Sequence, residues 1–256
     1  MDALTRVVQG YLKAMAGRIK ETPGDYLVVD LETTGVDLAK DLIVQIGHCL
    51  VRDNRIIDNG SVVLDWHRVP LIEPAWLEER MVQTRNYVEY DKEGQPTGRR
   101  YRFTPQRLRT VGVDPPEVLR FYMEWLLELR QQGYFFIAHN GFHFDCALLE
   151  RHFARLFESP FRFEDREVFD TGMVVKAFQA GLYFHPGESP RDFANRVRPL
   201  RLKGIRWALD SFCVPYFKLD EKYQMDTNDS HEACWDVRAT HLLFQELLAR
   251  ASTPAQ

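Results

Sequence analysis

The chain has 256 residues, of which 45% are hydrophobic and 27% are charged, and its formal net charge is -4. These values are ordinary for a soluble globular protein, and the length suits one large domain with an elaborated insertion. No apolar run approaches the roughly 20 residues of a membrane span, which predicts no membrane partner. The acidic balance gives no general attraction to polyanions, so any binding of nucleic acid must depend on local basic patches.

Four cysteines are spread along the chain without the paired spacing of a zinc site; they are Cys49, Cys146, Cys213 and Cys234. We expect them to be free thiols that pack as small apolar residues, which is typical of a reducing compartment. The sequence therefore predicts a cytoplasmic protein that is not built on disulfides or structural zinc.

The N-terminal quarter predicts one helix followed by three strands. Residues 1–22 alternate apolar and basic positions at helical spacing and lack a signal-peptide core, which favours an amphipathic helix packed on the domain. Three apolar runs, separated by polar turns, then predict a strand meander: 26–29, which ends at Asp30, followed by 42–51 and 55–64. The first run is continuous, as in a strand that is buried on both faces.

The middle of the chain interrupts this pattern. Residues 65–114 are rich in Arg, Glu, Tyr and Gly and form an atypical basic insertion before the next helix. The remaining predicted elements are helix 115–130, strand 134–138, helix 142–157, strand 167–169 (ending at Asp170), and helices 205–216 and 230–251. Three strands come first, and strands then alternate with helices. This order indicates one α/β domain over 1–256, with a mixed sheet whose first three strands form a meander and which is flanked by helices.

The first cluster of candidate functional residues follows the first strand. Asp30 and Glu32 stand two positions apart, so on a strand their side chains point to the same side. Two such carboxylates repel each other and lose hydration, and a hard cation such as Mg²⁺ or Mn²⁺ can compensate them. An Asp-x-Glu also occurs on surfaces by chance. The apolar run before it and Thr33-Thr34-Gly35 after it favour a site.

The second cluster follows the strand at 134–138. The polar pair His139 and Asn140 comes directly after this strand, and Asp145 lies in the first turns of the next helix. A carboxylate at that place serves equally well as a partner of the helix dipole. Taken alone, this segment therefore fits either a site or a helix start.

The third cluster opens the last helix. Asp229 and Glu232 have the spacing of a capping box, which puts His231 in the first helical turn. At about 100° per residue, His231 and Asp236 lie about 140° apart around the helix, so they are not expected to bind one ion. The simpler division makes Asp236 a metal ligand and leaves His231 to meet an attacking water. A lone histidine here is more often a capping or surface residue.

Together these residues resemble a known pattern. Asp30, Glu32, Asp145, His231 and Asp236 occur in the order and contexts of the DEDD exonucleases, and the chain resembles their DEDDh (DnaQ-like) group. The four residues between His231 and Asp236 match this group rather than its tyrosine counterpart. The resemblance runs from about residue 26 to residue 248, and the insertion at 65–114 departs from it.

The resemblance implies an RNase H-like fold of about five strands and a two-metal-ion mechanism with two Mg²⁺ or Mn²⁺ ions. In that scheme Asp30 bridges the ions, Glu32 and Asp236 complete one site, and Asp145 supports the other. His231 takes the proton of the attacking water. The implied activity is that of a 3′–5′ exonuclease that releases nucleoside 5′-monophosphates from DNA, as in proofreading or repair.

The resemblance also implies a substrate site and partners. The backbone and hydroxyls of Thr33 and Thr34 are expected to hold the 3′-terminal nucleotide, with His139 and Asn140 nearby. The implied partners are single-stranded 3′ ends of DNA or RNA and, as a further candidate, a DNA polymerase. Monomers and homodimers are both compatible with the family.

Two basic stretches suit contact with a single strand, because arginine binds phosphate and neighbouring aromatic rings stack on bases. They are Arg99, Arg100, Arg102, Arg107 and Arg109 with Tyr101 and Phe103, and Arg191, Arg196, Arg198, Arg201, Lys203 and Arg206 before Trp207. Solvated charged faces explain each stretch equally well. Our hypothesis is that at least one of them guides the strand.

Three alternatives remain open from the sequence. The first is an RNA-directed 3′–5′ exoribonuclease of the same family, since no residue unambiguously recognises the 2′-hydroxyl. The second is a non-catalytic module that binds nucleic acid or a polymerase, against which the intact acids and His231 argue. The third is a structural metal-binding domain, which leaves His231 and the basic stretches unexplained.

Overall fold

The computed structural model describes residues 2–16, 24–84, 87–90, 96–100, 103–201, 203–225 and 232–252, with the backbone alone for 81–84, 87–90 and 96–100. At its centre is a five-stranded sheet in the order β3-β2-β1-β6-β7. The strands are β1 (Tyr26–Thr33), β2 (Ile43–Arg52), β3 (Arg55–Val63), β6 (Phe135–Ala138) and β7 (Val168–Asp170). β1, β2 and β3 are antiparallel neighbours, whereas β6 and β7 run parallel to β1. The predicted mixed sheet with a three-stranded meander is confirmed.

The central strand β1 extends beyond its predicted end. Its apolar residues are almost fully buried, as expected for a strand covered on both faces. The prediction ended the strand at Val29, but β2 continues to pair with it, so Asp30 lies opposite Gly47 and Glu32 opposite Gln45. Both acids therefore belong to the strand itself and face the same side of the sheet.

The predicted turn between β2 and β3 is also confirmed. Asp53 and Asn54 form a two-residue connection, and both have positive φ angles, of 48° and 62°. Such a turn matches the twist of two antiparallel strands. β3 is an outer strand of the sheet, and its Ile56 and Ile57 are about half exposed.

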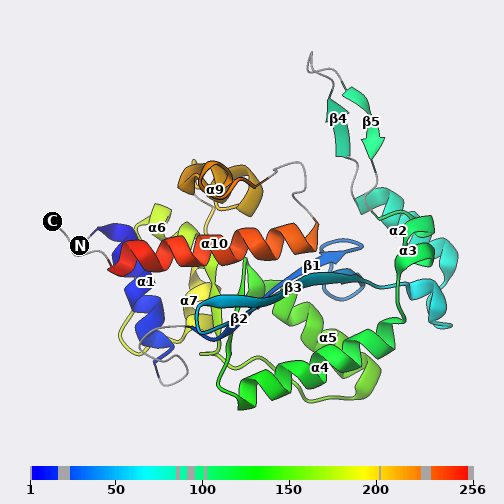
Figure 1. Ribbon diagram of the computed structural model, residues 1–256, viewed down its shortest axis with the longest axis horizontal. Coiled ribbons are helices and arrows are strands. Elements are labelled where there is room, and N and C mark those ends of the chain that lie inside the picture. The colour runs from blue at the N-terminus through cyan, green and yellow to red at the C-terminus, as the bar shows by residue number, and fades with distance from the viewer. Residues whose placement is uncertain are drawn as a thin grey trace.

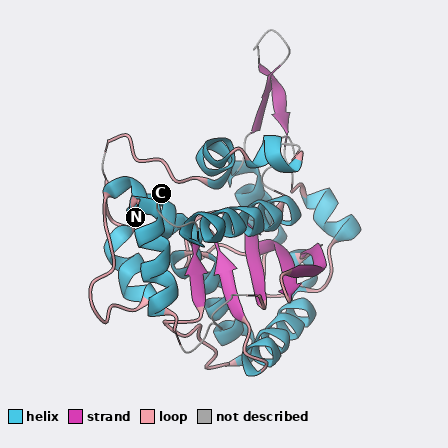
Figure 2. Ribbon diagram, turned by 60° about the vertical axis from the view of Figure 1, so that its left-hand side comes forward, coloured by secondary structure: helices cyan, strands magenta, loops and turns pink. Residues whose placement is uncertain are grey.

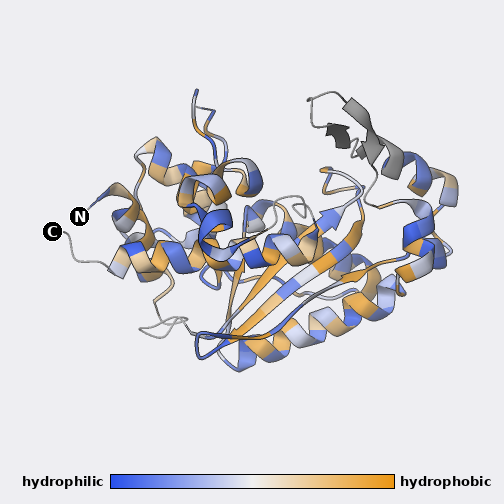
Figure 3. Cartoon of the chain, turned by 45° about the horizontal axis from the view of Figure 1, so that its top comes forward, coloured by the Kyte–Doolittle hydropathy of each residue, from blue (hydrophilic) through white to orange (hydrophobic). Residues whose placement is uncertain are grey.

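Helices cover both faces of the sheet (Figures 1 and 2). The long C-terminal helix α10 (Ala233–Ser252) crosses one face, with α1 (Ala3–Ala14) and α6 (Thr171–Ala180) packed against it, and α4 (Pro115–Gln131) and α5 (Asp145–Phe157) lie on the other face. Hydrophobic residues gather along the central strands (Figure 3). No helix among the described residues is both long and apolar enough to cross a bilayer.

The 65–114 segment contains elements that the sequence did not predict. They are the 3₁₀ turn η1 (Trp66–Arg68), helix α2 (Pro74–Thr84), a two-stranded antiparallel sheet of β4 (Tyr87–Tyr90) and β5 (Pro96–Arg100), and helix α3 (Pro105–Val111). α3 begins conventionally, because the Thr104 side chain accepts a hydrogen bond from the Arg107 N–H and proline occupies the first turn. The polar composition of this segment hides its helices from an apolar-periodicity search.

Three helix predictions need correction. The predicted helix 142–157 is a 3₁₀ turn, η2 (Gly141–His143), followed by α5, because Phe144 between them has the non-helical angles φ -136° and ψ -78°. The predicted helix 205–216 is a π turn, η3 (Leu209–Cys213), followed by the short α8 (Val214–Phe217). The predicted helix 230–251 is α10, which the structure begins at Ala233. The further helices α7 (Pro190–Val197) and α9 (Leu219–Tyr223) were not predicted.

Candidate functional site

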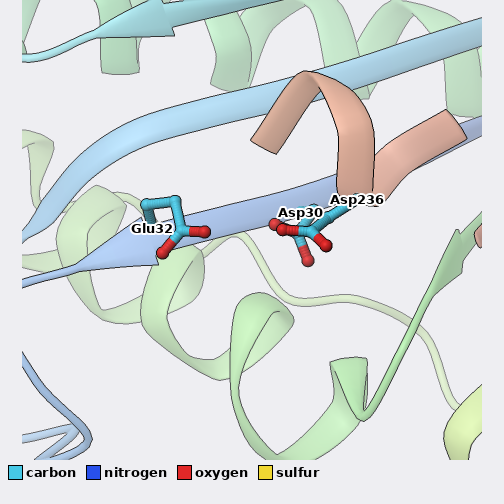
Figure 4. A group of neighbouring side chains, drawn as sticks. All are labelled: Asp30, Glu32 and Asp236. Atoms are coloured by element: carbon cyan, nitrogen blue, oxygen red, sulfur yellow. The ribbon is translucent and has the colours of Figure 1, made fainter. Parts of the chain in front are cut away.

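Three of the predicted ligands meet between β1 and the first turn of α10. Each of Asp30, Glu32 and Asp236 offers a carboxylate oxygen, and these oxygens all lie within 4.8 Å of one another. Figure 4 shows the side chains of Asp30 and Glu32 on β1 and that of Asp236 on α10. Glu32 and Asp236 are buried, and Asp30 is partly buried. The arrangement brings together residues that are about 200 positions apart in sequence.

α10 reaches this position because β2 allows a close approach. Gly47, opposite Asp30, faces the start of the helix, and a β-carbon there would lie 2.4 Å from the carbonyl oxygen of Ala233. Two residues earlier on the same face, the Gln45 side-chain oxygen accepts a hydrogen bond from the Ala233 N–H at 3.1 Å. A glycine and a capping amide on β2 therefore determine where Asp236 lies.

Asp145, the fourth predicted acid, is tied to the same strand. Its carboxylate accepts a hydrogen bond from the Leu31 N–H at 3.0 Å, and Leu31 lies between Asp30 and Glu32. Asp145 is buried, and burial, together with the nearby negative charges of Asp170 and Asp236, raises the pKa of its carboxyl group well above the ordinary value. The described site thus concentrates negative charge, which a cation would stabilise.

A further buried acid, Asp170, organises the turn beside Asp145. Its carboxylate accepts hydrogen bonds from the backbone N–H groups of Asn140, Phe142 and Met173, at 2.9, 3.4 and 3.1 Å. Burial nevertheless raises the pKa of Asp170 to about 6. The sequence analysis placed Asp170 at the end of a strand. Its role as a helix N-cap could have been suspected from that place in the sequence.

The polar pair after β6 has two different environments. Both ring nitrogens of His139 are engaged, one with the Thr171 hydroxyl at 3.0 Å and the other with the Trp207 carbonyl at 2.6 Å. Burial lowers the pKa of His139 to about 4, so the ring is neutral near pH 7. The side-chain oxygen of Asn140, in contrast, is buried and accepts no hydrogen bond from the described residues. Asn140 is therefore the better placed of the two to receive a ligand group.

The threonines after Glu32 shape the loop that follows β1. The Thr34 hydroxyl donates to the Asp41 carboxylate at 2.9 Å and accepts from the Leu42 N–H at 3.0 Å, so its side chain is fully used within the fold. The Thr33 hydroxyl donates to the Gly35 carbonyl at 2.5 Å. Asp41 is also paired with Arg80 of α2. Contact of the two threonines with a substrate stays a prediction, and it concerns their backbone more than their hydroxyls.

The predicted general base, His231, lies outside the described residues, as does Asp229 of the expected capping box. The described chain resumes at Glu232, whose carboxylate is bound by Arg107 of α3 at 2.9 Å and by Gln45 at 3.3 Å. The role of His231 therefore stays a prediction from the sequence.

Only some residues of the two basic stretches are available to contact a nucleic-acid strand. Several of their arginines form ion pairs within the protein: Arg107 with Glu232, Arg109 with Glu78, Arg191 with Asp165 and Arg196 with Glu188. Among the described residues, four exposed cations of the second stretch have no acidic partner: Arg198, Arg201, Lys203 and Arg206. They precede Trp207, whose ring stacks on His139 beside Asn140. The second stretch thus stays a candidate for guiding a strand, whereas the side chains of Arg99, Arg100, Tyr101 and Arg102 in the first lie outside the described residues.

Fold and site together define a candidate metal centre made of carboxylates at the central strand of an RNase H-like sheet. Its donors are all oxygens and are largely buried, which suits a hard divalent cation such as Mg²⁺ or Mn²⁺. Two supports of this centre, Gln45 and Gly47, were missed by the sequence analysis. The glycine inside the predicted strand was an available signal, because an interior strand glycine often marks the close approach of another backbone.

No protein-family model matches the chain, and no curated protein matches it. Among solved structures it is similar to E. coli exonuclease I in complex with a dA16 oligonucleotide (17% identity, TM-score 0.51) and to the zinc-bound E. coli ExoI–ssDNA complex (16%, TM-score 0.54). It is also similar to exonuclease I from Methylocaldum szegediense (18%, TM-score 0.51). Each match covers 90% of this chain and 41% of the other. The chain thus has the exonuclease I fold over less than half the length of those proteins.

Proposed function

We propose that the protein is a divalent-metal-dependent 3′–5′ exonuclease of the DEDDh type that acts on single-stranded DNA. One observation carries the proposal: Asp30, Glu32 and Asp236 converge within 4.8 Å on a fold shared with exonuclease I. Asp145 completes the four-acid pattern through its bond to the Leu31 N–H. DNA is favoured over RNA because the similar structures include oligonucleotide complexes of exonuclease I, such as that with dA16.

In the proposed mechanism Asp30, Glu32 and Asp236 hold divalent cations, and Asp145 supports them. Bound Mg²⁺ or Mn²⁺, two ions in the DEDDh scheme, supplies charge stabilisation to the phosphoryl oxygens during displacement. Glu32, Asp145 and Asp236 are buried, and the oxygens of Asp30, Glu32 and Asp236 lie close enough to share a cation. The Asn140 amide, whose oxygen is otherwise unused among the described residues, is available to orient the terminal nucleotide.

His231 is proposed as the general base. It precedes Glu232 directly in sequence, at the start of the helix that carries Asp236. A neutral imidazole there takes a proton from water as the water oxygen bonds to phosphorus. The bond from phosphorus to the 3′ oxygen of the preceding nucleotide breaks, and that oxygen is protonated. The products are a nucleoside 5′-monophosphate and a strand that is shorter by one nucleotide.

The deciding experiment is digestion of 3′- and 5′-labelled single-stranded DNA and RNA with Mg²⁺, with Mn²⁺ or with EDTA. We expect metal-dependent laddering from the 3′ end of DNA, which Asp30→Ala and Asp236→Asn abolish. His231→Ala should still bind metal but turn over about 10²–10⁴-fold more slowly, as for loss of other general bases.

The same experiment separates the alternatives. Faster digestion of RNA would identify an exoribonuclease. Turnover by Asp30→Ala equal to the wild type would refute the mechanism. Absence of cleavage with either polymer and either metal would favour the non-catalytic binding module. A polymerase partner, and the choice between monomer and homodimer, stay predictions from the resemblance.

A further inference from the structure

An ion pair joins the atypical insertion to the start of the helix that carries Asp236. The two guanidinium Nη atoms of Arg107, on α3, bind the two carboxylate oxygens of Glu232 at 2.9 and 3.3 Å. The guanidinium also lies over the ring of Phe103, 4.8 Å from its centroid. A two-pronged contact of this kind fixes orientation as well as distance. The pair therefore restricts how the insertion and Glu232 lie relative to each other.

Glu232 is also the residue on which the first turn of α10 is built. Its carbonyl accepts hydrogen bonds from the N–H groups of Trp235 at 2.8 Å and of Asp236 at 3.0 Å. Its side chain receives a further bond from Gln45 of β2 at 3.3 Å. Glu232 thus connects the insertion, the sheet and the backbone of a carboxylate ligand.

The neighbouring arginine on α3 offers a comparison. Arg109 pairs with Glu78 at 3.1 Å, and both residues belong to the 65–114 segment, so this pair joins α3 only to α2. The side chains of Arg109 and Glu78 are 50% and 46% exposed, against 35% and 29% for Arg107 and Glu232. Ion pairs as exposed as these contribute little to overall stability. The two pairs differ in the segments that they connect: Arg109–Glu78 joins α3 to α2, whereas Arg107–Glu232 joins α3 to the start of α10.

We propose that Arg107 is a positioning residue of the carboxylate centre: acting through Glu232, it fixes the first turn of α10 and with it Asp236. The insertion then has a defined function: through the Arg107–Glu232 pair it holds the start of α10, which carries the third cluster, in place. This inference rests on the proposed function where turnover is measured, but its metal-binding test does not. Residues that orient a metal ligand typically change metal affinity or activity by about 10–100-fold when they are replaced.

The test compares Arg107→Gln with the matched control Arg109→Gln in the full chain. Mn²⁺ affinity is measured by electron paramagnetic resonance, and kcat, KM and the salt dependence of strand binding are measured with labelled single-stranded DNA. We expect Arg107→Gln to weaken Mn²⁺ binding and lower kcat by about 10–100-fold, with an unchanged salt slope. Arg109→Gln, which breaks only the pair within the insertion, should leave Mn²⁺ affinity and kcat at their wild-type values. Thermal unfolding should be nearly the same for the three proteins.

A double-mutant cycle separates this inference from direct contact with the substrate. Glu232→Gln should reproduce the defect of Arg107→Gln, and the double variant should be no worse than either, because both changes break one interaction. If Arg107 instead contacts a phosphate, Arg107→Gln raises KM, flattens the salt slope and adds to the effect of Glu232→Gln. That result would overturn the inference, as would wild-type Mn²⁺ affinity in Arg107→Gln.

The two proposals fail in different ways. If the wild-type protein binds Mn²⁺ but cleaves no strand, the proposed exonuclease activity is refuted. The comparison of Mn²⁺ affinities then still tests the positioning role of Arg107. If the wild-type protein shows no measurable Mn²⁺ binding, both the proposed metal centre and the positioning role of Arg107 are refuted. Arg107→Lys serves as a second variant: it keeps the charge but loses the two-pronged contact, so we expect only partial recovery of Mn²⁺ affinity.

Discussion

The contact between β2 and α10 gives a sharp prediction, because a single added methyl group should disturb it. Gly47 lies opposite Asp30, and a β-carbon built on it lies 2.4 Å from the Ala233 carbonyl oxygen, 2.6 Å from the carbonyl carbon and 2.8 Å from the Ala233 β-carbon. Two of these atoms are backbone, so no side-chain rotation can relieve the overlap. Gly47→Ala must therefore push the first turn of α10 away from the sheet.

The size of this displacement follows from the distances. Ordinary van der Waals contact begins at 3.4 Å, so the carbonyl oxygen of Ala233 has to move by about 1 Å to reach it. Asp236 lies on the same helical turn and should move with it. Overpacking of this kind costs about 1–3 kcal/mol of stability. Misplacement of a catalytic group by about 1 Å can lower turnover about 10²-fold.

The assay compares Gly47→Ala with Gly60→Ala. Gly60 also lies on a strand of the sheet, but the nearest atom to its added β-carbon, on the His48 ring, is 3.4 Å away. Mn²⁺ affinity, kcat and thermal unfolding are measured for both variants. We expect losses in all three quantities for Gly47→Ala and nearly wild-type values for Gly60→Ala. Wild-type Mn²⁺ affinity and kcat in Gly47→Ala would refute the proposed docking of α10.

Three further predictions follow. Burial raises the pKa of Asp145, so without a metal ion its ionisation lowers the stability of the folded state as pH rises. Asp145→Asn should therefore raise Tm in EDTA at pH 8, and it should abolish turnover. Burial lowers the pKa of His139 from 6.5 to about 4, so its contribution to stability, complete above pH 6.5, is lost towards pH 4. Urea unfolding of His139→Gln should depend less on pH over this range. Replacing Arg198, Arg201 and Arg206 by alanine should flatten the log–log salt slope of single-strand binding by about 2.

The parts of the fold that follow from short-range patterns were predictable. The β2–β3 connection follows from Asp53 and Asn54, which tolerate positive φ, and α4 follows from Asp114 and Pro115 at its start. Likewise, the two-residue period of a strand directs Asp30 and Glu32 to one side without any knowledge of the rest of the chain. In each case the determining residues are neighbours in sequence.

The convergence of Asp236 on Asp30 could be predicted only by resemblance. It depends on the absence of a side chain at Gly47 and on the amide of Gln45, both on a different strand from Asp30. The glycine indicates only that something approaches β2 closely, not which segment of the chain does so. In the same way, the turn before α5 is held by the Asp170 carboxylate, which accepts hydrogen bonds from the N–H groups of Asn140 and Phe142. These contacts join segments about 30 residues apart, which periodicity does not detect.

The acids of this site also explain why the sequence identified it at all. A folding chain loses stability when it buries carboxylates beside one another, and the raised pKa values of Asp145 and Asp170 record that cost. Asp30 and Glu32 interrupt a strand that is otherwise apolar and buried, so they contradict the pattern that forms the strand. Violations of this kind are expected at functional sites. A cation bound among these carboxylates would offset that cost and link β1 to the first turn of α10.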